Sequence, residues 1–253
     1  MEITGPGETA LDNNNPMGTT SYKLVALLPM KAHSARVRGK NFRIFAGRPL
    51  FQWVLEALLS VPEVDLVVIN TDASEELAKC NVRTDGRVLL RERKPELCGD
   101  FVSMNAVLAD DVAAIDAETY LMTHTTNPLL SARTIRRAID SYRAGLAAGD
   151  CDSLFTVNAF QTRFYRRDGS PINHDPNNLI RTQDLEPWYE ENSNLYLFNR
   201  ASFAATKARI GKKPLLFETP RLESADIDDQ TGWSIAEMLA LSLLISNVRS
   251  SDA

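Results

Sequence analysis

The first concentration of residues that could do chemistry is a basic segment near the start of the chain. Residues 31–41 read KAHSARVRGKN, so four cations, Lys31, Arg36, Arg38 and Lys40, fall within ten residues. The segment follows a short apolar run, Leu24–Leu28, which has the character of a buried strand. Backbone N–H groups and cationic side chains in a loop after such a strand suit a triphosphate. A solvated basic loop is the alternative interpretation.

A second candidate site lies near the other end, where residues 223–229 read ESADIDD. Side chains alternate along an extended chain, so Asp226 and Asp228 share one face. Two carboxylates on one face repel each other unless a cation neutralises them, and Mg²⁺ takes hard oxygen ligands where phosphates are present. The alternative is a helix N-terminus, where acidic side chains face the positive end of the dipole. A basic phosphate loop with a paired-aspartate metal site implies phosphoryl or nucleotidyl transfer.

Two common phosphate-binding motifs are missing from the sequence. There is no G-x-G-x-x-G, which argues against a dinucleotide site. There is no G-x-x-x-x-G-K-[ST] either, because Gly39-Lys40 is followed by Asn41 and position 34 is Ser34. The sequence therefore excludes a P-loop kinase.

The elements that must position these residues follow from the hydrophobic pattern. Apolar runs alternate with amphipathic segments over residues 22–157, which predicts βαβ units and an α/β fold. The sheet is expected to be mostly parallel and Rossmann-like, with helices on both faces. Ligands bind at the carboxyl ends of such strands, so the loops at 30–41, 71–72 and 123–127 are the expected site. The expected strands are Leu24–Leu28, Val64–Asn70, Val88–Leu90, Tyr120–His124 and Leu154–Val157.

The rest of the chain departs from this rhythm. Residues 1–20 are rich in Gly, Asn, Thr and Pro and are expected to be a disordered leader before one domain at 21–253. Residues 161–200 are polar and aromatic, with a strand at Leu195–Phe198, and are interpreted as a small lid or dimerisation insertion. A long helix is expected from Asp229 onward, well buried through an apolar stripe that includes Ile235, Met238, Leu239 and Leu243.

Composition removes several classes of function. Lys and Arg total 28 against 33 Asp and Glu, and the resulting net charge of −5 argues against nucleic acid as a partner. No apolar run reaches about 18 residues and the first residues lack a signal-peptide pattern, so no membrane association is expected. Cys80, Cys98 and Cys151 are too widely spaced for C-x-x-C zinc ligation and fit a reducing, cytoplasmic location.

Six blocks, taken in order, resemble the CMP-sialic acid synthetase family, also called acylneuraminate cytidylyltransferases. Members of that family have a nucleotidyltransferase sheet and use CTP and Mg²⁺ to join CMP to an acidic acceptor, with release of pyrophosphate. The blocks are LLPMKAHSARVRGKN at 27–41, NTD at 70–72, RKPELCGD at 93–100, TTNPL at 125–129, RTQ and NSNLY at 181–183 and 192–196, and ESADID at 223–228.

The resemblance implies a role for each matching residue. Lys31, Ser34 and Lys40 correspond to triphosphate ligands, with Arg36 as a substitute for a family cation that is Ala35 here. The implied cytosine readers are Asn41, Arg93 and, more loosely, Ser103. The implied Mg²⁺ ligands are Asp226 and Asp228. The implied acceptor-binding residues are Arg181 and Gln183. The residues expected to act in catalysis are Lys31, Lys40 and Asp228.

Departures from the family pattern fall on the acceptor side. His124 stands where the family has Gln, and Leu130 stands where it often has Arg. His124 is expected to bind the acceptor and supplies a cation in place of an amide. These changes favour the phosphonate-pathway branch of the family, in which CMP is transferred to a small phosphonate. The alternatives are a CMP-nonulosonic (sialic-type) sugar acid synthetase, a nucleotidyltransferase for a sugar 1-phosphate, and a non-catalytic nucleotide-binding domain. A homodimer is expected.

Overall fold

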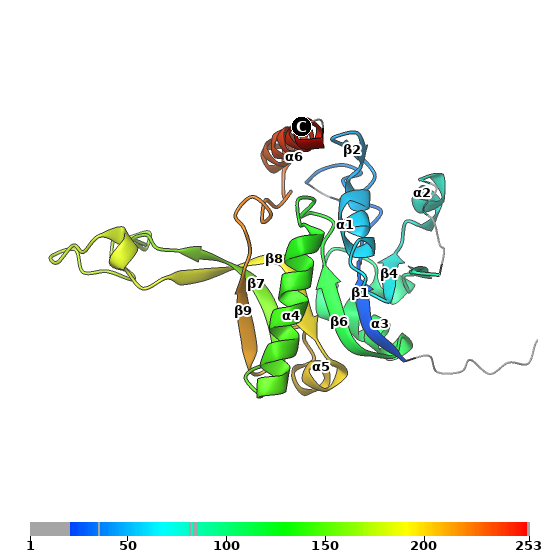
Figure 1. Cartoon of the computed structure of the whole chain (residues 1–253), viewed down its shortest axis with the longest axis horizontal. Coiled ribbons are helices and arrows are strands. Elements are labelled where there is room, and N and C mark those ends of the chain that lie inside the picture. Colours follow the sequence, from blue (N-terminus) through cyan, green and yellow to red (C-terminus); the bar gives the residue numbers. More distant parts are fainter. Residues whose placement is uncertain (1–20, 35, 81, 83–85, 252–253) are drawn as a thin grey trace, which may run out of the picture.

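A seven-stranded sheet forms the centre of the molecule, in the strand order β5-β4-β1-β6-β8-β7-β9. The computed structural model describes residues 21–34, 36–80, 82 and 86–251, so the expected leader lies outside the described residues (Figure 1). The strands are β1 (Tyr22–Leu27), β4 (Leu66–Thr71), β5 (Val88–Glu92), β6 (Ala117–Thr123), β7 (Ser153–Phe160), β8 (Trp188–Phe198) and β9 (Pro214–Glu218).

The sheet is mostly parallel, as the alternating pattern predicts. Strands β5, β4, β1 and β6 run parallel, and β9 runs parallel to β7. Strand β8 is antiparallel to both of its neighbours, β6 and β7. Because β1, β4 and β6 share one direction, their carboxyl ends meet at one edge of the sheet. The three loops expected to form the site leave from that edge.

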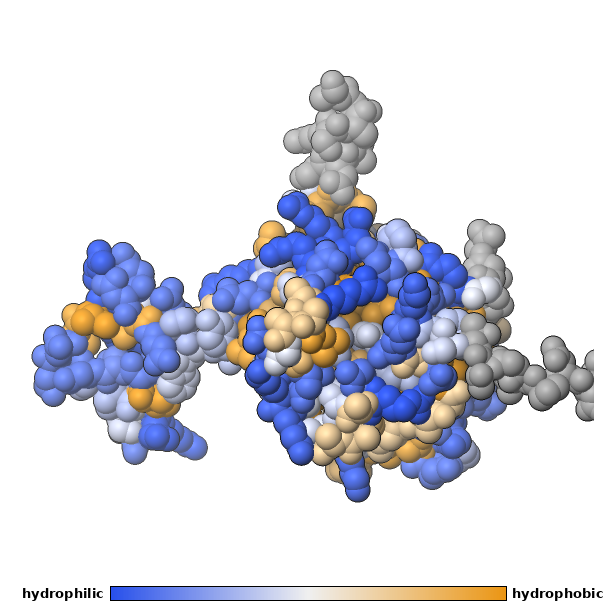
Figure 2. All heavy atoms as spheres, turned by 60° about the horizontal axis from the view of Figure 1, so that its bottom comes forward, coloured by the Kyte–Doolittle hydropathy of each residue, from blue (hydrophilic) through white to orange (hydrophobic). Residues whose placement is uncertain are grey.

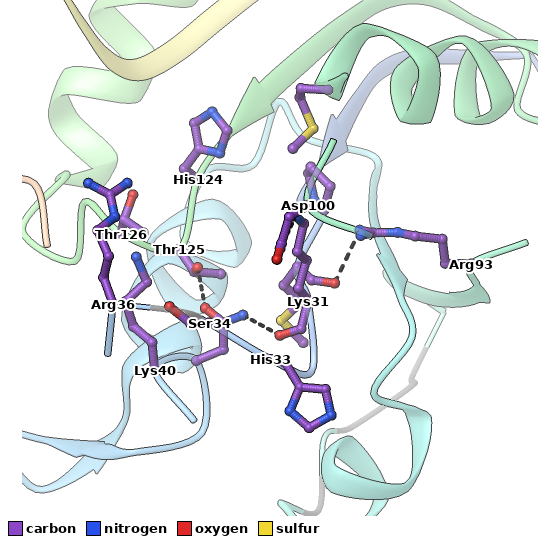
Figure 3. A pocket seen from close by; sticks show the side chains of 14 residues that line it. Lys31, His33, Ser34, Arg36, Lys40, Arg93, Asp100, His124, Thr125 and Thr126 are labelled. Atoms are coloured by element: carbon purple, nitrogen blue, oxygen red, sulfur yellow. Dashed lines mark hydrogen bonds and ion pairs between the residues drawn. The ribbon is translucent and has the colours of Figure 1, made fainter. Parts of the chain in front are cut away.

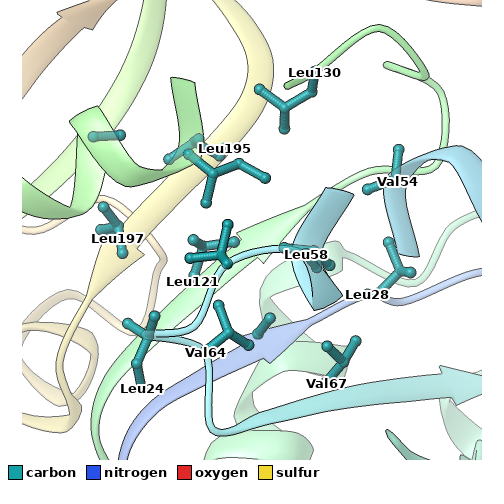
Figure 4. Close-up of a cluster of buried hydrophobic side chains, with 14 of the residues drawn as sticks. Leu24, Leu28, Val54, Leu58, Val64, Val67, Leu121, Leu130, Leu195 and Leu197 are labelled. Atoms are coloured by element: carbon teal, nitrogen blue, oxygen red, sulfur yellow. The ribbon is translucent and has the colours of Figure 1, made fainter. Parts of the chain in front are cut away.

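Helices cover both faces of the sheet. On one face, α1 (Leu50–Leu59) and α4 (Ala132–Ala148) pack on side chains such as Leu24, Val67 and Leu121 (Figures 1 and 4). On the other face, α3 (Met104–Ala114) and α5 (Arg200–Thr206) cover a second apolar cluster. Every residue of β4 is buried, because its side chains meet a helical layer on either side.

A small third core holds the C-terminal helix, α6 (Gln230–Ser251), against a two-stranded hairpin of β2 (Ile44–Phe45) and β3 (Arg48–Pro49). Trp233, Ala236 and Ala240 supply the buried face of α6. The expected stripe is wrong, because Ile235 is 49% exposed and Met238 is 64% exposed. The helix meets the body through small residues and one tryptophan, which leaves much of its apolar surface uncovered.

Residues 161–187, called the arm from here on, project from the body between β7 and β8 (Figure 1). The arm holds a short 3₁₀ turn, η2 (Thr182–Asp184), and its only buried residue is Leu185. The strand expected at Leu195–Phe198 begins earlier, at Trp188, because its polar first half pairs with the end of β7 at the base of the arm.

Two further short elements complete the chain. These are α2 (Ser74–Lys79) and the 3₁₀ turn η1 (Pro95–Leu97). Within the described residues, no helix combines the length and the hydropathy needed to cross a bilayer.

Candidate active site

A cavity of about 280 Å³ opens at the carboxyl ends of β1 and β6. Figure 3 shows Arg36, Lys40 and Thr126 gathered on one side of it and Arg93 on the opposite side. The loops after β1 and β6 supply most of its wall, as the parallel sheet predicts. The lining residues are Pro29, Met30, Lys31, His33, Ser34, Arg36, Lys40, Asn41, Arg93, Asp100, Met104, His124, Thr125 and Thr126.

The loop after β1 is held in place by its neighbours in the sheet. Met30 forms an isolated parallel bridge with Thr71, and its N–H donates to the carbonyl of Asn70 at 3.0 Å. The N–H of Ala32 donates to the Asp72 carboxylate at 2.6 Å. The Asn-Thr-Asp block at 70–72 therefore fixes the start of the basic loop.

Three of the four loop cations line the cavity and each already has an anionic or carbonyl partner. The ammonium group of Lys31 lies 3.3 Å from Asp100, and Arg36 lies 2.9 Å from Asp228. The Lys40 ammonium donates to the Ile227 carbonyl at 2.8 Å. Burial lowers the pKa of Lys40, while the charges of Asp226 and Asp228 act in the opposite direction. Ser34 lines the same wall, whereas Arg38 does not.

Asp226 and Asp228 flank a residue that is fixed to the cavity wall. The N–H of Ile227 donates to the Thr126 carbonyl at 2.9 Å, and the Ile227 side chain is fully buried in the third core. Alternation along the chain then directs both aspartates to the opposite side, toward the cations. Partial burial raises the pKa of Asp226, and the charge of Asp228 raises it further, against a hydrogen bond from Thr126.

This aspartate pair fits a hard divalent cation. Mg²⁺ is commonly held by one or two carboxylates together with substrate phosphates and water. A cation between Asp226 and Asp228 would remove the repulsion that raises the pKa of Asp226. The pair lies beside Lys40 and Arg36 at the cavity, where a triphosphate would be held.

Arg93 lies on the opposite wall and is held by hydrogen bonds to Asn70 and Met30. Its Nε donates to Asn70 Oδ1 at 2.9 Å, and its Nη2 donates to the carbonyls of Asn70 and Met30 at 2.8 and 3.1 Å. The amide of Asn70 donates in turn to Asp111, which is fully buried and ion-paired with Arg91. Nη1 of Arg93 has no hydrogen-bond partner among the described residues and remains for a ligand in the cavity.

The other two expected cytosine readers differ from each other in placement. Asn41 lines the cavity, donates to the Lys31 carbonyl at 2.8 Å and accepts from the Thr125 hydroxyl at 2.7 Å. It therefore ties the basic loop to the end of β6. Ser103 lies outside the cavity lining, and its hydroxyl accepts from Ala106 N–H as the N-cap of α3. Its expected contact with the base is not supported by this placement.

The acceptor-side residues are divided between two places. His124 lines the cavity, and burial lowers its pKa to about 4, with the charges of Arg209 and Lys40 acting in the same direction. This environment favours the neutral imidazole near pH 7 and does not support the expectation that His124 supplies a cation. Arg181 and Gln183 lie on the arm, where Arg181 forms an ion pair with Asp184 at 2.7 Å. Within one chain they do not join the cavity lining.

Several lining residues were not expected from the sequence. Asp100 forms the ion pair with Lys31, and Thr125 and Thr126 anchor Asn41 and Asp226. The sequence did indicate these three residues, because they lie within the two blocks at 93–100 and 125–129 that resemble the family. Met104 gives no such signal, since it lies in the first turn of α3 and reaches the cavity through packing alone.

Comparison with known proteins agrees with this geometry. The cytidylyltransferase family model matches residues 25–226. An N-acylneuraminate cytidylyltransferase of Oncorhynchus mykiss is 28% identical over 86% of this chain, which spans 50% of that relative's length. A CMP-N,N'-diacetyllegionaminic acid synthase of Legionella pneumophila is 27% identical over 86% of this chain and 96% of its own.

Solved structures share the fold. A structure of CMP:2-keto-3-deoxy-manno-octonic acid synthetase complexed with CTP superposes with a TM-score of 0.61 at 15% identity, covering 87% of this chain and 99% of its own. A 4-diphosphocytidyl-2C-methyl-D-erythritol synthase of Anaerococcus prevotii gives a TM-score of 0.60 at 12% identity, covering 86% of this chain and 95% of its own. The family model covers most of the sheet and the whole cavity wall, so this chain belongs to the cytidylyltransferase family, within its CMP-sialic acid synthetase group.

Proposed function

We propose that this protein transfers CMP from CTP to a sugar acid of the nonulosonic type and releases pyrophosphate. The observation that carries the proposal is one cavity with a cationic wall and a fixed Arg93 opposite it. Asp226 and Asp228 lie just outside the cavity lining, where Asp228 pairs with Arg36 and both charges act on Lys40. The names of the relatives support the acceptor class, because both curated relatives described above are named for sugar-acid reactions.

The preference for a phosphonate acceptor is not supported. It depended on His124 and Leu130 standing in place of family residues on the acceptor side, with His124 as a cation. The environment of His124 favours its neutral form near pH 7, and Arg181 lies on the arm of its own chain. A neutral imidazole can donate to or accept from a sugar hydroxyl, which suits a polyhydroxylated acid better than a second negative charge.

In the proposed reaction an acceptor oxygen attacks the α-phosphorus of CTP, and the bond to the β-phosphate oxygen breaks. Lys31, Arg36 and Lys40, which line the cavity, would stabilise the pyrophosphate as its charge develops. Asp226 and Asp228 would hold Mg²⁺, which offsets charge on phosphate oxygens when bound. Arg93 would read the cytosine edge through the Nη1 group that the protein leaves free.

The experiment that tests the acceptor is a competition. Purified protein is supplied with CTP, Mg²⁺ and an equimolar mixture of N-acetylneuraminate, a legionaminic-type acid and 2-aminoethylphosphonate, and CMP adducts are identified by mass. A sugar-acid adduct formed first supports the proposal. A phosphonate adduct alone would restore the phosphonate acceptor, and CTP binding without any adduct would favour a non-catalytic nucleotide-binding domain.

We also propose that two copies pair through the arm. Its apolar side chains include Tyr165, Leu179 and Ile180, which are 53%, 62% and 43% exposed. Figure 2 shows hydrophobic atoms on the arm among hydrophilic ones. An extension that buries so little of its own apolar surface gains stability when a second surface covers it.

A cytoplasmic location is proposed on the cysteine chemistry. Cys80, Cys98 and Cys151 are all free thiols. Free thiols in a chain of this size are typical of a reducing compartment.

A further inference from the structure

Three side chains, Glu191 and Tyr196 of β8 and Arg209 from the segment after α5, contact one another. Arg209 Nη2 donates to the Tyr196 hydroxyl at 3.1 Å and lies 3.4 Å from a Glu191 carboxylate oxygen. The guanidinium carbon lies 4.2 Å from the centre of the Tyr196 ring, and the Tyr196 hydroxyl also donates to Glu191. These contacts fix the position of one guanidinium group.

The sheet register places Tyr196 of this cluster on the same face as His124, although none of the three side chains belongs to the cavity lining. Tyr196 is the register partner of Met122, and His124 follows two residues later on the same face. The backbone N–H of Arg209 donates to Asn105 at 3.3 Å, and Asn105 is next to Met104, which lines the cavity. The charge of Arg209 acts on His124, since it helps to lower the pKa of that imidazole.

The contacts of Arg209 leave much of its hydrogen-bonding capacity unused. Both of its side-chain hydrogen bonds use Nη2. Nε and Nη1 have no hydrogen-bond partner among the described residues. The Arg209 side chain is 20% exposed and that of Glu191 is 40% exposed, so ligand atoms can reach the group. An ion pair with this much exposure adds little to stability, which leaves recognition as the stronger reason for the arrangement.

We propose that Arg209 is an acceptor-binding residue that holds the acid group of the acceptor by a two-pronged hydrogen bond. The inference rests on the proposed function, CMP transfer to an acid. Glu191 and Tyr196 orient the guanidinium, and a planar fork matches a carboxylate or a phosphonate better than an ammonium does. Neutral His124 lies beside the bound acid and hydrogen-bonds a hydroxyl of the acceptor.

Binding is measured first, because it needs no turnover. N-acetylneuraminate and 2-aminoethylphosphonate are each titrated by calorimetry into protein saturated with CMP. Wild type should bind one of the two acids, and Arg209→Gln should weaken that binding at least about tenfold while CMP affinity stays within twofold. Arg209→Lys should restore little of the loss, because it replaces the fork by a point charge.

The methyl ester of N-acetylneuraminate separates loss of the acid contact from general damage. If the carboxylate is the bound acid, wild type should prefer the acid to its ester, and Arg209→Gln should bind the two about equally. The control variant is Arg200→Gln. Arg200 likewise contacts a tyrosine hydroxyl and a carboxylate, Tyr120 and Asp116, but near the start of β6. It should leave the acid-to-ester preference unchanged.

The outcomes distinguish this inference from the function on which it rests. Unchanged acid binding and an unchanged ester preference in Arg209→Gln would overturn the role of Arg209, even if wild type makes a CMP adduct. Absence of binding of either acid to wild type would overturn it as well. A wild-type protein that binds an acid through Arg209 and makes no adduct would retain the binding role and refute the transfer reaction. Glu191→Gln gives a second, milder variant, for which an acceptor KM raised several-fold with unchanged CTP KM is expected.

Discussion

Ile227 determines which way its two acidic neighbours face. Its side chain is buried in the third core, while its N–H and carbonyl contact Thr126 and Lys40. Asp226 and Asp228 must then lie toward the cationic wall, where a divalent cation and a triphosphate can share them. One buried aliphatic residue therefore orients the two aspartates proposed to hold the metal.

Asp228→Asn should lower kcat/KM by at least about 100-fold, because charge is lost where phosphate charge develops. The measurement is the rate of pyrophosphate release at several Mg²⁺ concentrations. Asp229→Asn is the matched control, because Asp229 accepts from Gly232 N–H at 2.8 Å and asparagine caps a helix equally well. Equal activity of the two variants would refute the assignment of Asp228 as a metal ligand.

His124 gives the protein a defined response to acid. Its folded-state pKa of about 4 lies below the 6.5 of an unperturbed histidine. Between these values the unfolded chain binds more protons, so the free energy of unfolding falls as pH drops through that window, by about 3 kcal/mol. His124→Gln should remove this part of the pH dependence in urea-unfolding curves measured from pH 7 to 4.

The exposed His33 is the control for this experiment. His33→Gln should leave the pH dependence of stability as it is in wild type. If the free energy of unfolding falls equally with pH in His124→Gln and in wild type, the fold does not hold His124 in its neutral form.

At the scale of elements, α6 and the β2–β3 hairpin hold the aspartate segment through Trp233. Its ring lies 5.4 Å from that of Phe45, and Arg43 lies 4.3 Å above it. Trp233→Ala should destabilise the protein by about 3–5 kcal/mol, as expected for a large buried aromatic residue. Ile235→Ala, at a half-exposed position on the same helix, should cost about 0.5 kcal/mol or less. Chemical unfolding compares the two, and similar losses would contradict this description of the third core.

The sequence predicts the parallel strands well, because buried strands such as β4 are continuous apolar runs. It fails where contacts from elsewhere decide the structure. The polar first half of β8 is a strand only because β7 pairs with it, and β2 and β3 are two residues each. The burial of α6 was wrongly predicted, since Leu239 of the expected stripe packs against the third core while Ile235, Met238 and Leu243 are largely exposed.

The residues of the candidate site also divide into those that the sequence predicts and those that only the folded structure reveals. The basic loop, Arg93, His124 and the aspartate pair lie in recognisable blocks, and the sheet brings them together. Arg209 lies outside every block and outside the cavity lining, and only the register of β6 with β8 and the contact with Asn105 relate it to His124 and Met104. Arg181 and Gln183 lie within a block, but the sequence pattern does not predict that their segment projects away from the body as the arm.

At the scale of the whole molecule, the arm makes a prediction about assembly. Wild type should have twice the mass of one chain in light scattering. A variant with Leu179→Asp and Ile180→Asp on the arm should have the mass of one chain. Met238→Asp places one such charge on the uncovered side of α6 and should leave the mass unchanged. Dissociation by Met238→Asp and not by the arm variant would place the contact on α6 instead.

The measurement that most directly tests the central claim is pyrophosphate release from a panel of nucleotides. Wild type is supplied with Mg²⁺, the sugar-acid mixture and CTP, UTP, ATP or GTP in turn. Arg93 lines the cavity and is held by Asn70, with Nη1 unpaired among the described residues, and an unmatched buried polar group costs about 1–3 kcal/mol. CTP should therefore exceed UTP at least about tenfold in kcat/KM, with a CMP adduct of the acid as product. Equal use of CTP and UTP, or release that does not depend on an acid, would contradict a cytidylyltransferase acting on a sugar acid.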